Sequence, residues 1–394
     1  MHIEKNIKLL LWLNFCTDFI FFAPVAILYF AHVTGSYALG MSIFSIAYVS
    51  SAMFEVPTGI ISDLVGRKKT TILGALSAVA CVVFYAIGGS YWVLAIGSLF
   101  QGLSRAFYSG NNDALLHDTL KEIGKEDDYH TYLGKTSSMF QVALAIAAVT
   151  GGFMAARSYA LVMWASVIPQ ICALLISTQI VEPKILNKGS TNIYSHLLES
   201  IKYFKQNRKL RLLSIASSLK FGLGESGYFL RSVFIMDLWP LWAIGVASAL
   251  SNVGAAASYY FGGKVIDRFK PLRVLSFEVI STRAVNLIAI LFPSIISPAL
   301  MGASSLTFGV GWVALGSLLQ KEFTHAQRAT MGSINTLVGN LAFGVFSVVL
   351  GVFADWYGAR TALIVINIAL FAPLFFYRKI FLHEQAKGDR MGTS

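Results

Sequence analysis

Long apolar runs constrain the fold of this chain more than any other feature. A helix needs roughly 20 apolar residues to cross a hydrocarbon core about 30 Å thick, and runs of that length recur along the whole sequence. Charged residues make up 13% of the 394 positions, and the mean hydropathy is +0.65, whereas soluble domains carry about 25% charged residues. The sequence therefore predicts an all-α membrane protein with little chain left for a soluble domain.

We expect twelve transmembrane helices, separated by charged breaks. The predicted spans are 7–30, 38–60, 70–89, 92–116, 135–155, 159–180, 211–235, 239–262, 273–292, 297–320, 332–354 and 360–378. An even number of spans places both chain ends on the same side of the membrane. The first run is too long for a signal-peptide core and no small-residue cleavage site follows it, so we expect a span that is retained.

Basic residues indicate the orientation. The formal net charge is +11, and most Lys and Arg residues fall in segments on the side of the two chain ends, while the opposite loops hold only Arg157 and Arg360. By the positive-inside rule, this asymmetry predicts cytoplasmic termini. The basic composition is therefore explained by topology, and we expect the lipid bilayer as partner and no nucleic acid.

Motifs for cofactors and covalent chemistry are missing from the sequence. Cys16, Cys81 and Cys172 are solitary and lie in apolar runs, without the spacing of a metal site. The chain has no GxxxxGK[ST], HExxH or nucleophile-elbow pattern. We therefore expect no cofactor, no metal site and no enzymatic activity.

A hydrophilic stretch near the middle of the chain divides it into halves. The predicted organisation is a six-helix bundle over 1–180, a cytoplasmic linker over 181–210, a second six-helix bundle over 211–378 and a cytoplasmic tail over 379–394. In the linker, the apolar residues share one face of a helix, which favours a short helix lying on the membrane surface. These residues are Ile193, Leu197, Ile201 and Phe204.

A compact basic turn, residues 59–69, separates the second and third predicted spans. Its glycine, acidic and basic residues resemble the loop motif of the major facilitator superfamily, at positions Gly59, Asp63, Gly66 and Arg67. The pattern continues in Glu55, before the turn, as in many bacterial members. This resemblance implies two pseudo-symmetric six-helix bundles, substrate binding midway between them and transport by alternating access. It also implies a monomer in the bacterial cytoplasmic (inner) membrane.

The second half of the chain repeats the basic turn in degenerate form. Gly263, Asp267 and Arg268 match the spacing of Gly59, Asp63 and the basic residues after it. Internal repeats of this kind are expected of transporters built from two related bundles. The prediction of the fold therefore does not depend on the first motif alone.

The resemblance also implies a gate at the cytoplasmic ends of the helices. Asp63 would cap a helix of the opposite half, and Arg67 would pair with an acidic residue at the end of the fourth span. The acidic candidates are Asp113 and Asp118, and Glu55 would support the gate. The alternative is that the Lys and Arg residues only set the topology.

Ionisable residues inside predicted spans are costly and often functional. Asp18 lies halfway along the first span and Glu225 near the middle of the seventh. In the family that the chain resembles, spans 1, 4, 7 and 10 line the central cavity. The resulting substrate-cavity and proton-coupling candidates are Asn14, Asp18, Arg105, Lys220, Glu225 and Trp312.

Asp18 is the first candidate for a proton carrier, because burial favours a neutral carboxyl and a nearby cation favours a charged one. A permanent pair with Arg105 is the structural alternative. Glu225 is either functional or paired with Lys220 or Arg231, and the glycines around it could break the helix. Arg283, in the ninth span, is expected to pair with a buried acid such as Glu278.

Two positions depart from the family's pattern. The arginine expected in the fourth span is replaced by Ser98, although Arg105 lies on nearly the same face. The fifth span has the spacing of the antiporter motif, with Ala in place of two glycines and the proline. We expect close packing there without the characteristic kink.

The resemblance is closest to bacterial drug/proton antiporters. It favours proton-coupled efflux of small amphipathic or drug-like molecules. The alternatives are transport of an organic anion, motivated by Arg105 and Lys220, and a transporter-like ligand sensor.

Overall fold

A computed structural model describes residues 3–184, 202–323 and 328–391. The chain forms two compact units, and every regular element in the described part is helical. Unit 1 comprises Met1–Gly189 with Trp239–Ala249, and unit 2 comprises Ser190–Leu238 with Leu250–Ser394. Each unit is described on its own.

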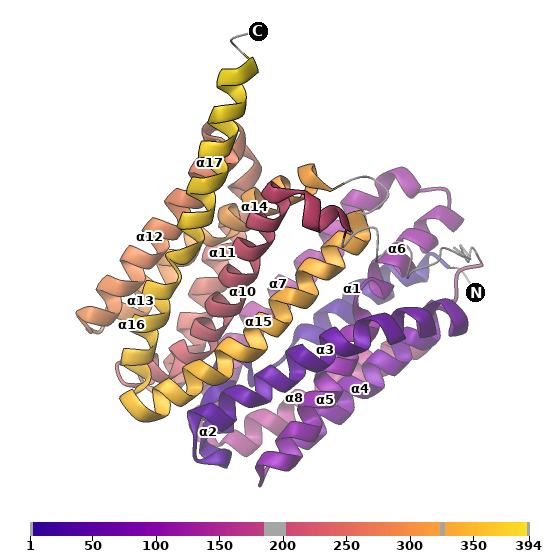
Figure 1. Ribbon diagram of the computed structural model, residues 1–394. Helices are drawn as coiled ribbons and strands as arrows, with labels where there is room; N and C mark the ends of the chain where they lie inside the picture. The colour runs from indigo at the N-terminus through magenta and orange to yellow at the C-terminus, as the bar shows by residue number, and fades with distance from the viewer. Residues whose placement is uncertain (1–2, 185–201, 324–327, 392–394) are drawn as a thin grey trace. The chain divides into compact units, whose positions relative to one another are not determined.

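Unit 1 is a bundle of long helices joined by short turns (Figure 1). Its elements are α1 (Lys5–Asp18), η1 (Ala23–Val25), α2 (Ala26–Thr34), α3 (Tyr37–Val65), α4 (Arg67–Ile87), α5 (Tyr91–Tyr108), α6 (Asn111–Glu122), η2 (Glu126–Asp128), α7 (Tyr129–Arg157) and α8 (Tyr159–Gln179). Serine N-caps start three of them: Ser36, Ser90 and Ser158 accept hydrogen bonds from the backbone N–H groups of Leu39, Val93 and Ala160. Such caps satisfy N–H groups that have no partner within the helix.

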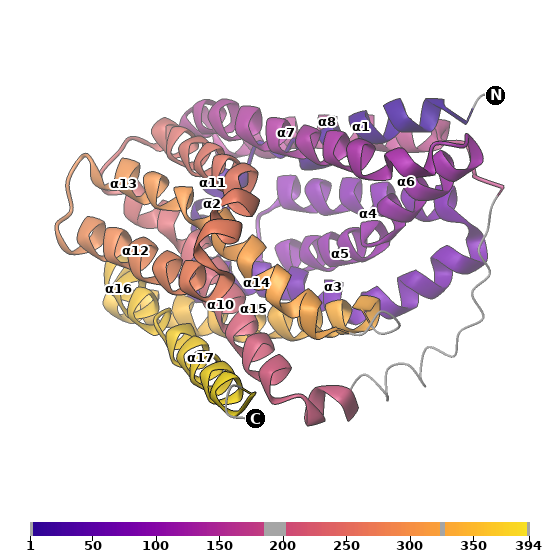
Figure 2. The same cartoon turned by 90° about the horizontal axis from the view of Figure 1, so that it is seen from above.

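Helices α3, α4, α5 and α8 lie side by side in unit 1 (Figure 2). Close approach of α3 and α5 depends on Gly102, because a Cβ at that position would lie 2.6 Å from the Ala47 carbonyl oxygen. Between α4 and α5, the buried Tyr85 side chain fills the contact and is bonded at its hydroxyl to Ser98 and Gln101, at 2.8 and 3.0 Å. Small and polar residues of this kind are typical of helix interfaces in membranes.

Unit 2 has the same helical construction. Its elements are α10 (Arg208–Met236), most of α11 (Leu241–Phe269), α12 (Pro271–Leu291), α13 (Ser297–Ala303), η3 (Ser304–Leu306), α14 (Phe308–Glu322), α15 (Arg328–Tyr357), α16 (Ala359–Ala369) and α17 (Ala372–Met391). Residues 202–206 form a helical turn before α10.

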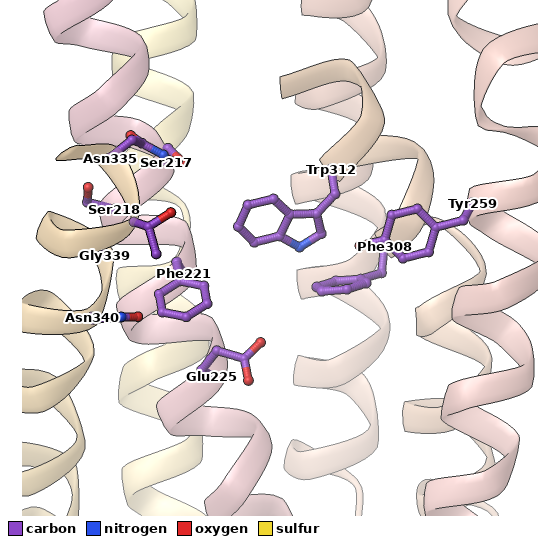
Figure 3. A pocket seen from close by; sticks show the side chains of 11 residues that line it. Ser217, Ser218, Phe221, Glu225, Tyr259, Phe308, Trp312, Asn335, Gly339 and Asn340 are labelled. Carbon is purple, nitrogen blue, oxygen red and sulfur yellow. Dashed lines mark hydrogen bonds between the residues drawn. The ribbon is translucent and has the colours of Figure 1, made fainter. Parts of the chain in front are cut away.

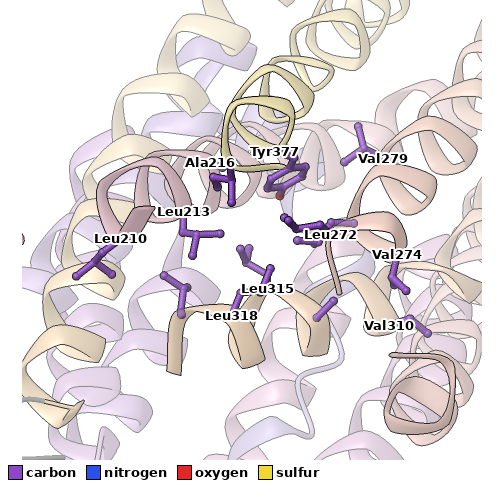
Figure 4. Packing of buried hydrophobic residues seen from close by; sticks show 14 of the residues in the cluster. Leu210, Leu213, Ala216, Leu272, Val274, Val279, Val310, Leu315, Leu318 and Tyr377 are labelled. Carbon is purple, nitrogen blue, oxygen red and sulfur yellow. The ribbon is translucent and has the colours of Figure 1, made fainter. Parts of the chain in front are cut away.

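A buried apolar cluster joins α10, α12, α14 and α17 (Figure 4). Its members Leu213, Leu275, Leu315 and Tyr377 are at most 1% exposed. The leucines of α10 and α14 recur at intervals of three and four residues, so they share one face of each helix. This packing fixes the helices that carry the polar residues described below.

Ten stretches of the described residues are long and apolar enough to cross a membrane. The helices α5 and α10 complete six spans in each unit, but they carry Arg105 in one case and Lys220, Glu225 and Arg231 in the other, which lowers their apolar character. The fold is therefore an all-α membrane fold of twelve spans.

The structure differs from the predicted spans in several places. The tenth span is divided into α13, η3 and α14, and the twelfth is divided between α16 and α17. The first span is discontinuous, because α1 ends at Asp18 and α2 starts at Ala26. The fourth ends at Tyr108, and the following residues, predicted as its last turns, belong to the separate α6. The predicted tail continues α17 as far as Met391. Ile193, Leu197 and Ile201, predicted to form the surface helix, lie outside the described residues.

Candidate functional site

Unit 2 contains a cavity of about 370 Å³ between its own helices (Figure 3). On α10, Ser217, Ser218, Phe221 and Glu225 share one face, and on α14, Phe308 and Trp312 are one turn apart, so each helix presents a coherent wall. The eleven lining residues are Ser217, Ser218, Phe221, Glu225, Tyr259, Phe308, Trp312, Asn335, Thr336, Gly339 and Asn340. Glu225 and Trp312, predicted from sequence as cavity residues, are among them.

Aromatic rings face the Glu225 carboxyl group across this cavity. Figure 3 shows Trp312 and Phe308 opposite Phe221 and Glu225. Trp312 makes edge contacts with both phenylalanines, at ring-centroid distances of 6.3 and 6.1 Å. Glu225 interacts electrostatically with Tyr259. Of the eleven lining residues, Glu225 alone carries a formal charge.

Amide and hydroxyl groups form the remaining wall. Asn335 of α15 donates a hydrogen bond to Ser217 of α10 over 3.2 Å, and Thr336 and Asn340 of the same helix, α15, also line the cavity. At Gly339, a Cβ would come within 3.2 Å of the Phe221 ring. This wall offers hydrogen-bond donors and acceptors to a ligand that lies flat against the aromatic rings.

Lys220, predicted to face substrate, instead forms a buried ion pair. Its Nζ atom lies 2.7 Å from Glu278 Oε2 of α12, and the two side chains are 7% and 2% exposed. Glu278 is the acid that the sequence analysis assigned to Arg283. A lysine at this point of α10 faces the neighbouring helix because it lies five residues before Glu225, on a different face of the helix.

Two partly buried arginines of unit 2, Arg231 and Arg283, take polar partners. Arg283 donates to the Asn367 side-chain oxygen of α16 over 3.2 Å and also interacts electrostatically with Glu278. Arg231 donates to the Ser251 hydroxyl and to the Met301 carbonyl oxygen. The helix break that the sequence allowed at the glycines around Glu225 does not occur, because α10 continues unbroken past them.

In unit 1, Asp18 lies at the break in the first span. It is the last residue of α1, and its carbonyl oxygen accepts a hydrogen bond from Ile20 over 2.9 Å. Arg105, in the last turn of α5, interacts electrostatically with Asp18, and its guanidinium lies 4.4 Å from the centroid of the Tyr48 ring. Asp18 is partly exposed and Arg105 is exposed, so this charged pair is more open than the pair in unit 2.

Helix α7 supports the break next to Asp18. A Cβ at Gly151 would overlap the Phe21 carbonyl oxygen in the interrupted segment, so only glycine allows this approach. Asn14, predicted as a cavity residue, donates its side-chain amide to the Thr136 carbonyl oxygen of the same helix over 3.4 Å. The small residues predicted for the fifth span therefore accommodate an irregular backbone.

Ser98 shows why the expected arginine is absent from α5. It is 0% exposed, and its hydroxyl lies 2.8 Å from the Tyr85 hydroxyl. The space that a longer side chain would need is occupied by Tyr85.

The basic turn, residues 59–69, is held by a residue that the sequence analysis missed. The Glu182 carboxylate accepts hydrogen bonds from the backbone N–H groups of Arg67 and Lys68, at 2.6 and 2.7 Å. Anions are stabilised at helix N-termini by these free N–H groups and by the helix dipole. Gly66 has φ +95°, and a Cβ there would lie 2.8 Å from Glu182 Oε1, so both its conformation and its small size are required.

Polar residues of α3 and α6 complete this arrangement. Arg67 donates to Ser62 over 2.8 Å, and its Nε lies 3.7 Å from Asp118 Oδ2. Asn111 links α6 to Ser62 and to Thr71, both at 2.9 Å.

The remaining gate candidates of unit 1 lie around this network. Asp113 is exposed on the first turn of α6, where desolvation raises the pKa of its carboxyl group. Glu55 is partly buried on α3. Gly59 has open space at its Cβ position, and the Asp63 side chain lies outside the described part of the structure.

The repeated turn in unit 2 is built differently. Asp267 and Arg268 are exposed in the last turn of α11, and Arg268 lies 5.4 Å from the centroid of the Phe269 ring. Lys270, with φ +65°, makes the turn before α12. A non-glycine residue rarely adopts this conformation.

Sequence reasoning also missed the polar wall of the cavity and the partner of Lys220. Glu278 was visible as an acid inside a predicted span, which is a strong signal, but its pairing depended on the relative rotation of α10 and α12. Tyr259, Asn335 and Asn340 gave no comparable signal, because aromatic and amide residues are common in membrane helices.

Comparison with known families gives one match over most of the chain. The model of the Major Facilitator Superfamily matches residues 9–346. One curated relative, "Uncharacterized transporter BU466" of Buchnera aphidicola subsp. Acyrthosiphon pisum (strain APS), is 29% identical over 115 residues, which span 29% of this chain and 28% of that protein.

Solved structures with the same fold include several transporters. A mutant form of the nucleoside transporter NupG gives a TM-score of 0.83 at 13% identity, covering 96% of this chain and 100% of that one. A bacterial homolog of the human lysosomal transporter Spinster gives 0.80 at 14% identity, covering 96% and 97%. The D-xylose-proton symporter gives 0.74 at 14% identity, covering 95% and 97%. Identities this low support the fold alone.

Proposed function

Because the chain belongs to the Major Facilitator Superfamily and is a membrane transporter, we propose that it exports a small amphipathic molecule, neutral or cationic, in exchange for protons. Transport occurs by alternating access, in which the substrate-binding residues open to one side of the membrane and then to the other. Energy comes from the proton gradient.

The cavity of unit 2 is the observation that carries this proposal. Its single formal charge, on Glu225, attracts a cation, and the rings of Phe221, Phe308 and Trp312 stabilise a flat or cationic group. The amides of Asn335 and Asn340 add hydrogen bonds. Lys220 does not oppose a cation here, because Glu278 neutralises it at 2.7 Å.

Asp18 remains the proton-carrier candidate in unit 1. It lies at a break in a membrane span, and discontinuous helices are typical of ion and substrate sites in transporters. Asp18 is partly exposed as a residue, and Arg105 interacts with its carboxyl group electrostatically, so movement of the arginine would change the balance between the charged and the neutral form. Glu225 acts in this scheme as the counter-charge of the substrate.

A second candidate function is transport of an organic anion. The observation that favours it is Arg105, which is exposed and stacked over Tyr48 in unit 1. An arginine in that position can bind a carboxylate through two parallel hydrogen bonds. Arg105→Gln would then abolish the flux of an anion and leave the flux of a cation unchanged.

The test uses purified protein in liposomes that contain a trapped pH-sensitive dye. Three probes are compared: ethidium as a planar cation, uridine as a neutral ring compound and benzoate as an organic anion. We expect ethidium or uridine to move against its gradient when a pH gradient is imposed, with proton movement in the opposite direction. Glu225→Gln should lower ethidium transport roughly 10- to 100-fold, since a lost bond to a charged group costs about 1.5–3 kcal/mol. The exposed Asp127→Asn is the matched control.

The outcomes separate the competing functions. Benzoate flux without ethidium or uridine flux would replace the first function by anion transport. Proton movement in the same direction as the probe would contradict exchange. Binding of a probe to the detergent-solubilised protein without any flux would indicate a ligand sensor. Proton release on ethidium binding that is lost in Asp18→Asn would support Asp18 as the exchanged site.

Orientation, location and assembly are predictions from the sequence. The distribution of Lys and Arg supports cytoplasmic termini, and the family resemblance supports a bacterial inner membrane and a monomer. The gate roles of Asp63, Arg67, Asp113, Asp118, Asp267 and Arg268 are also predictions. Labelling of single cysteines placed near residue 35 and near residue 68 in intact cells would test the orientation, since only the former should react from outside.

A further inference from the structure

Lys220 and Glu278 form a charged pair in the interior of unit 2. The proposed transport cycle assigns this pair no part in proton exchange. Lys220 lies near the middle of α10 and Glu278 in the first half of α12, both within membrane-spanning helices. Their side chains are 7% and 2% exposed. Charges at such positions are expensive, and a pair of this kind is weak evidence for stability alone, because apolar residues of similar size are often as stable.

Two consecutive residues of α14, Gly311 and Trp312, lie between the ion pair and the cavity or make room for the pair next to it. At Gly311 of α14, a Cβ would lie 2.8 Å from both Lys220 Nζ and Glu278 Cγ, so the glycine makes room for the two charged groups. The next residue, Trp312, has its ring centroid 5.4 Å from Lys220 Nζ and lines the cavity. One indole ring therefore contacts both the ion pair and the space where substrate binds.

Other polar groups interact with Glu278 from its own helix and from α17. Arg283, on the same helix, interacts with it electrostatically and is anchored to Asn367 of α16. Tyr377 of α17 also interacts electrostatically with Glu278, and within the described residues its buried hydroxyl has no hydrogen-bond partner. This hydroxyl is available to a rearranged Glu278 side chain.

We propose that Glu278 is a second proton-exchange site and that Lys220 and Trp312 couple its protonation to substrate occupancy. A proton from water binds a carboxylate oxygen of Glu278, and the neutral pair becomes a single positive charge on Lys220. Lys220 then retains Trp312 as its neighbouring partner. A cation bound near Glu225 and a proton on Glu278 oppose each other by charge repulsion in this low-dielectric interior, which produces exchange.

Two double variants distinguish a role of the Lys220–Glu278 pair in proton coupling from a role in stabilising the fold. Lys220→Met with Glu278→Gln removes both charges and leaves no unpaired ion. The matched control is Lys209→Met with Glu322→Gln, which removes another Lys–Glu pair of unit 2, at 2.9 Å, whose side chains are 24% and 18% exposed. Both double variants are first checked for folding by thermal unfolding in detergent.

The first readout needs no substrate. Infrared difference spectra of the wild type between neutral and acidic pH should contain a carboxylic-acid C=O band that is absent in Glu278→Gln and present in the Lys209/Glu322 control. A wild-type spectrum that Glu278→Gln leaves unchanged would overturn the proposal, because Glu278 would then not take up a proton.

The second readout is the number of protons exchanged for each ethidium transported, and it rests on the proposed function. In liposomes held at zero membrane potential, the ethidium gradient that stops net flux is measured against the imposed pH gradient. We expect the number of protons exchanged per ethidium to fall by one in the Lys220/Glu278 double variant, while ethidium–ethidium exchange persists. An unchanged proton number would refute coupling at this pair. A wild type without flux of ethidium, uridine or benzoate would instead refute the proposed function, and the infrared result would still decide whether Glu278 is protonated.

Discussion

In unit 1 the acidic side chain inside the membrane, Asp18, ends a helix, is partly exposed and faces an exposed arginine. In unit 2 the corresponding helix, α10, is continuous, and its lysine is enclosed with Glu278 at 2.7 Å. The first arrangement places a carboxyl group at a helix end beside an exposed arginine, and the second encloses both charged groups between helices. The Asp18 site of unit 1 and the Lys220–Glu278 pair of unit 2 therefore differ in solvent access, while Glu225 of unit 2 lines the cavity.

This difference indicates separate tasks within one transporter. A carboxyl group at a helix break beside an exposed arginine can exchange its proton when that one side chain moves. An enclosed pair can do so only when its partner or its neighbour moves, which makes it sensitive to whatever occupies the adjoining cavity. Four pairs of substitutions test the comparison, beginning with the largest expected effect.

Replacing the basic side chain, Lys220 in unit 2 or Arg105 in unit 1, should give the largest difference in the free energy of unfolding between the two units. Lys220→Met leaves Glu278 buried without its partner and should lower the free energy of unfolding by about 3–5 kcal/mol. Arg105→Met in unit 1 should cost about 1 kcal/mol or less, because Arg105 is exposed and the charge interactions of exposed side chains contribute little. Thermal unfolding in detergent measures both, and equal losses would contradict the contrast in solvent access.

A substitution on α7 tests whether the break in the first span depends on close contact with that helix. Gly151→Ala introduces a Cβ that overlaps the Phe21 carbonyl oxygen, and such overpacking typically costs about 1–3 kcal/mol. Gly134→Ala, on the same helix, is the control, because the Cβ position of Gly134 has nothing within 4 Å. If both variants unfold at the same temperature, the break does not depend on the close approach of α7.

The basic turn of unit 1 should lose stability when its anionic cap is neutralised. Glu182→Gln weakens the bonds to the Arg67 and Lys68 N–H groups and removes the charge that faces the helix dipole, for a loss of about 1 kcal/mol. Asp127→Asn serves as control, because Asp127 is exposed. Hydrogen exchange of the first turn of α4 is the measurement, and faster exchange confined to Glu182→Gln is expected.

The smallest effect is expected at the equivalent turn of unit 2. Lys270 has φ +65°, a conformation that costs a non-glycine residue about 1–2 kcal/mol, so Lys270→Gly should raise the free energy of unfolding by about 0.5–1 kcal/mol after its own entropy cost. Gly66→Ala, in unit 1, should lower it. A stabilising Gly66→Ala would show that the two turns do not differ in the way described.

The architecture was predictable because its signal is repeated many times along the chain. Each apolar run carries its own evidence of a membrane helix, and the basic turn added a family resemblance that the match over residues 9–346 confirms. The break after Asp18 was missed because residues 19–22 are as apolar as a regular helix, although Pro24, at the start of η1, was a local signal of an interruption.

The site was predictable only in part, for a geometric reason. Glu225 and Trp312 could be named because a charge or a large ring inside a span is conspicuous. Lys220 was equally conspicuous, but its side chain faces α12, and the rotation that decides between cavity and neighbour is set by packing of α10 against the helices around it. Glu182 was missed because its role depends on the N-terminus of α4, 115 residues earlier in the chain.

That separation along the chain has a consequence for biosynthesis. The N–H groups at the start of α4 emerge from the ribosome long before Glu182, the acid that binds them. Helix α4 therefore enters the membrane while the N–H groups at its N-terminus lack their acidic partner. Glu182 can bind them only after the sixth span has been made. Capping of the α4 N-terminus is a late step in the assembly of unit 1. A chain truncated before residue 182 would keep all six spans of the unit but would lack the carboxylate that binds these N–H groups.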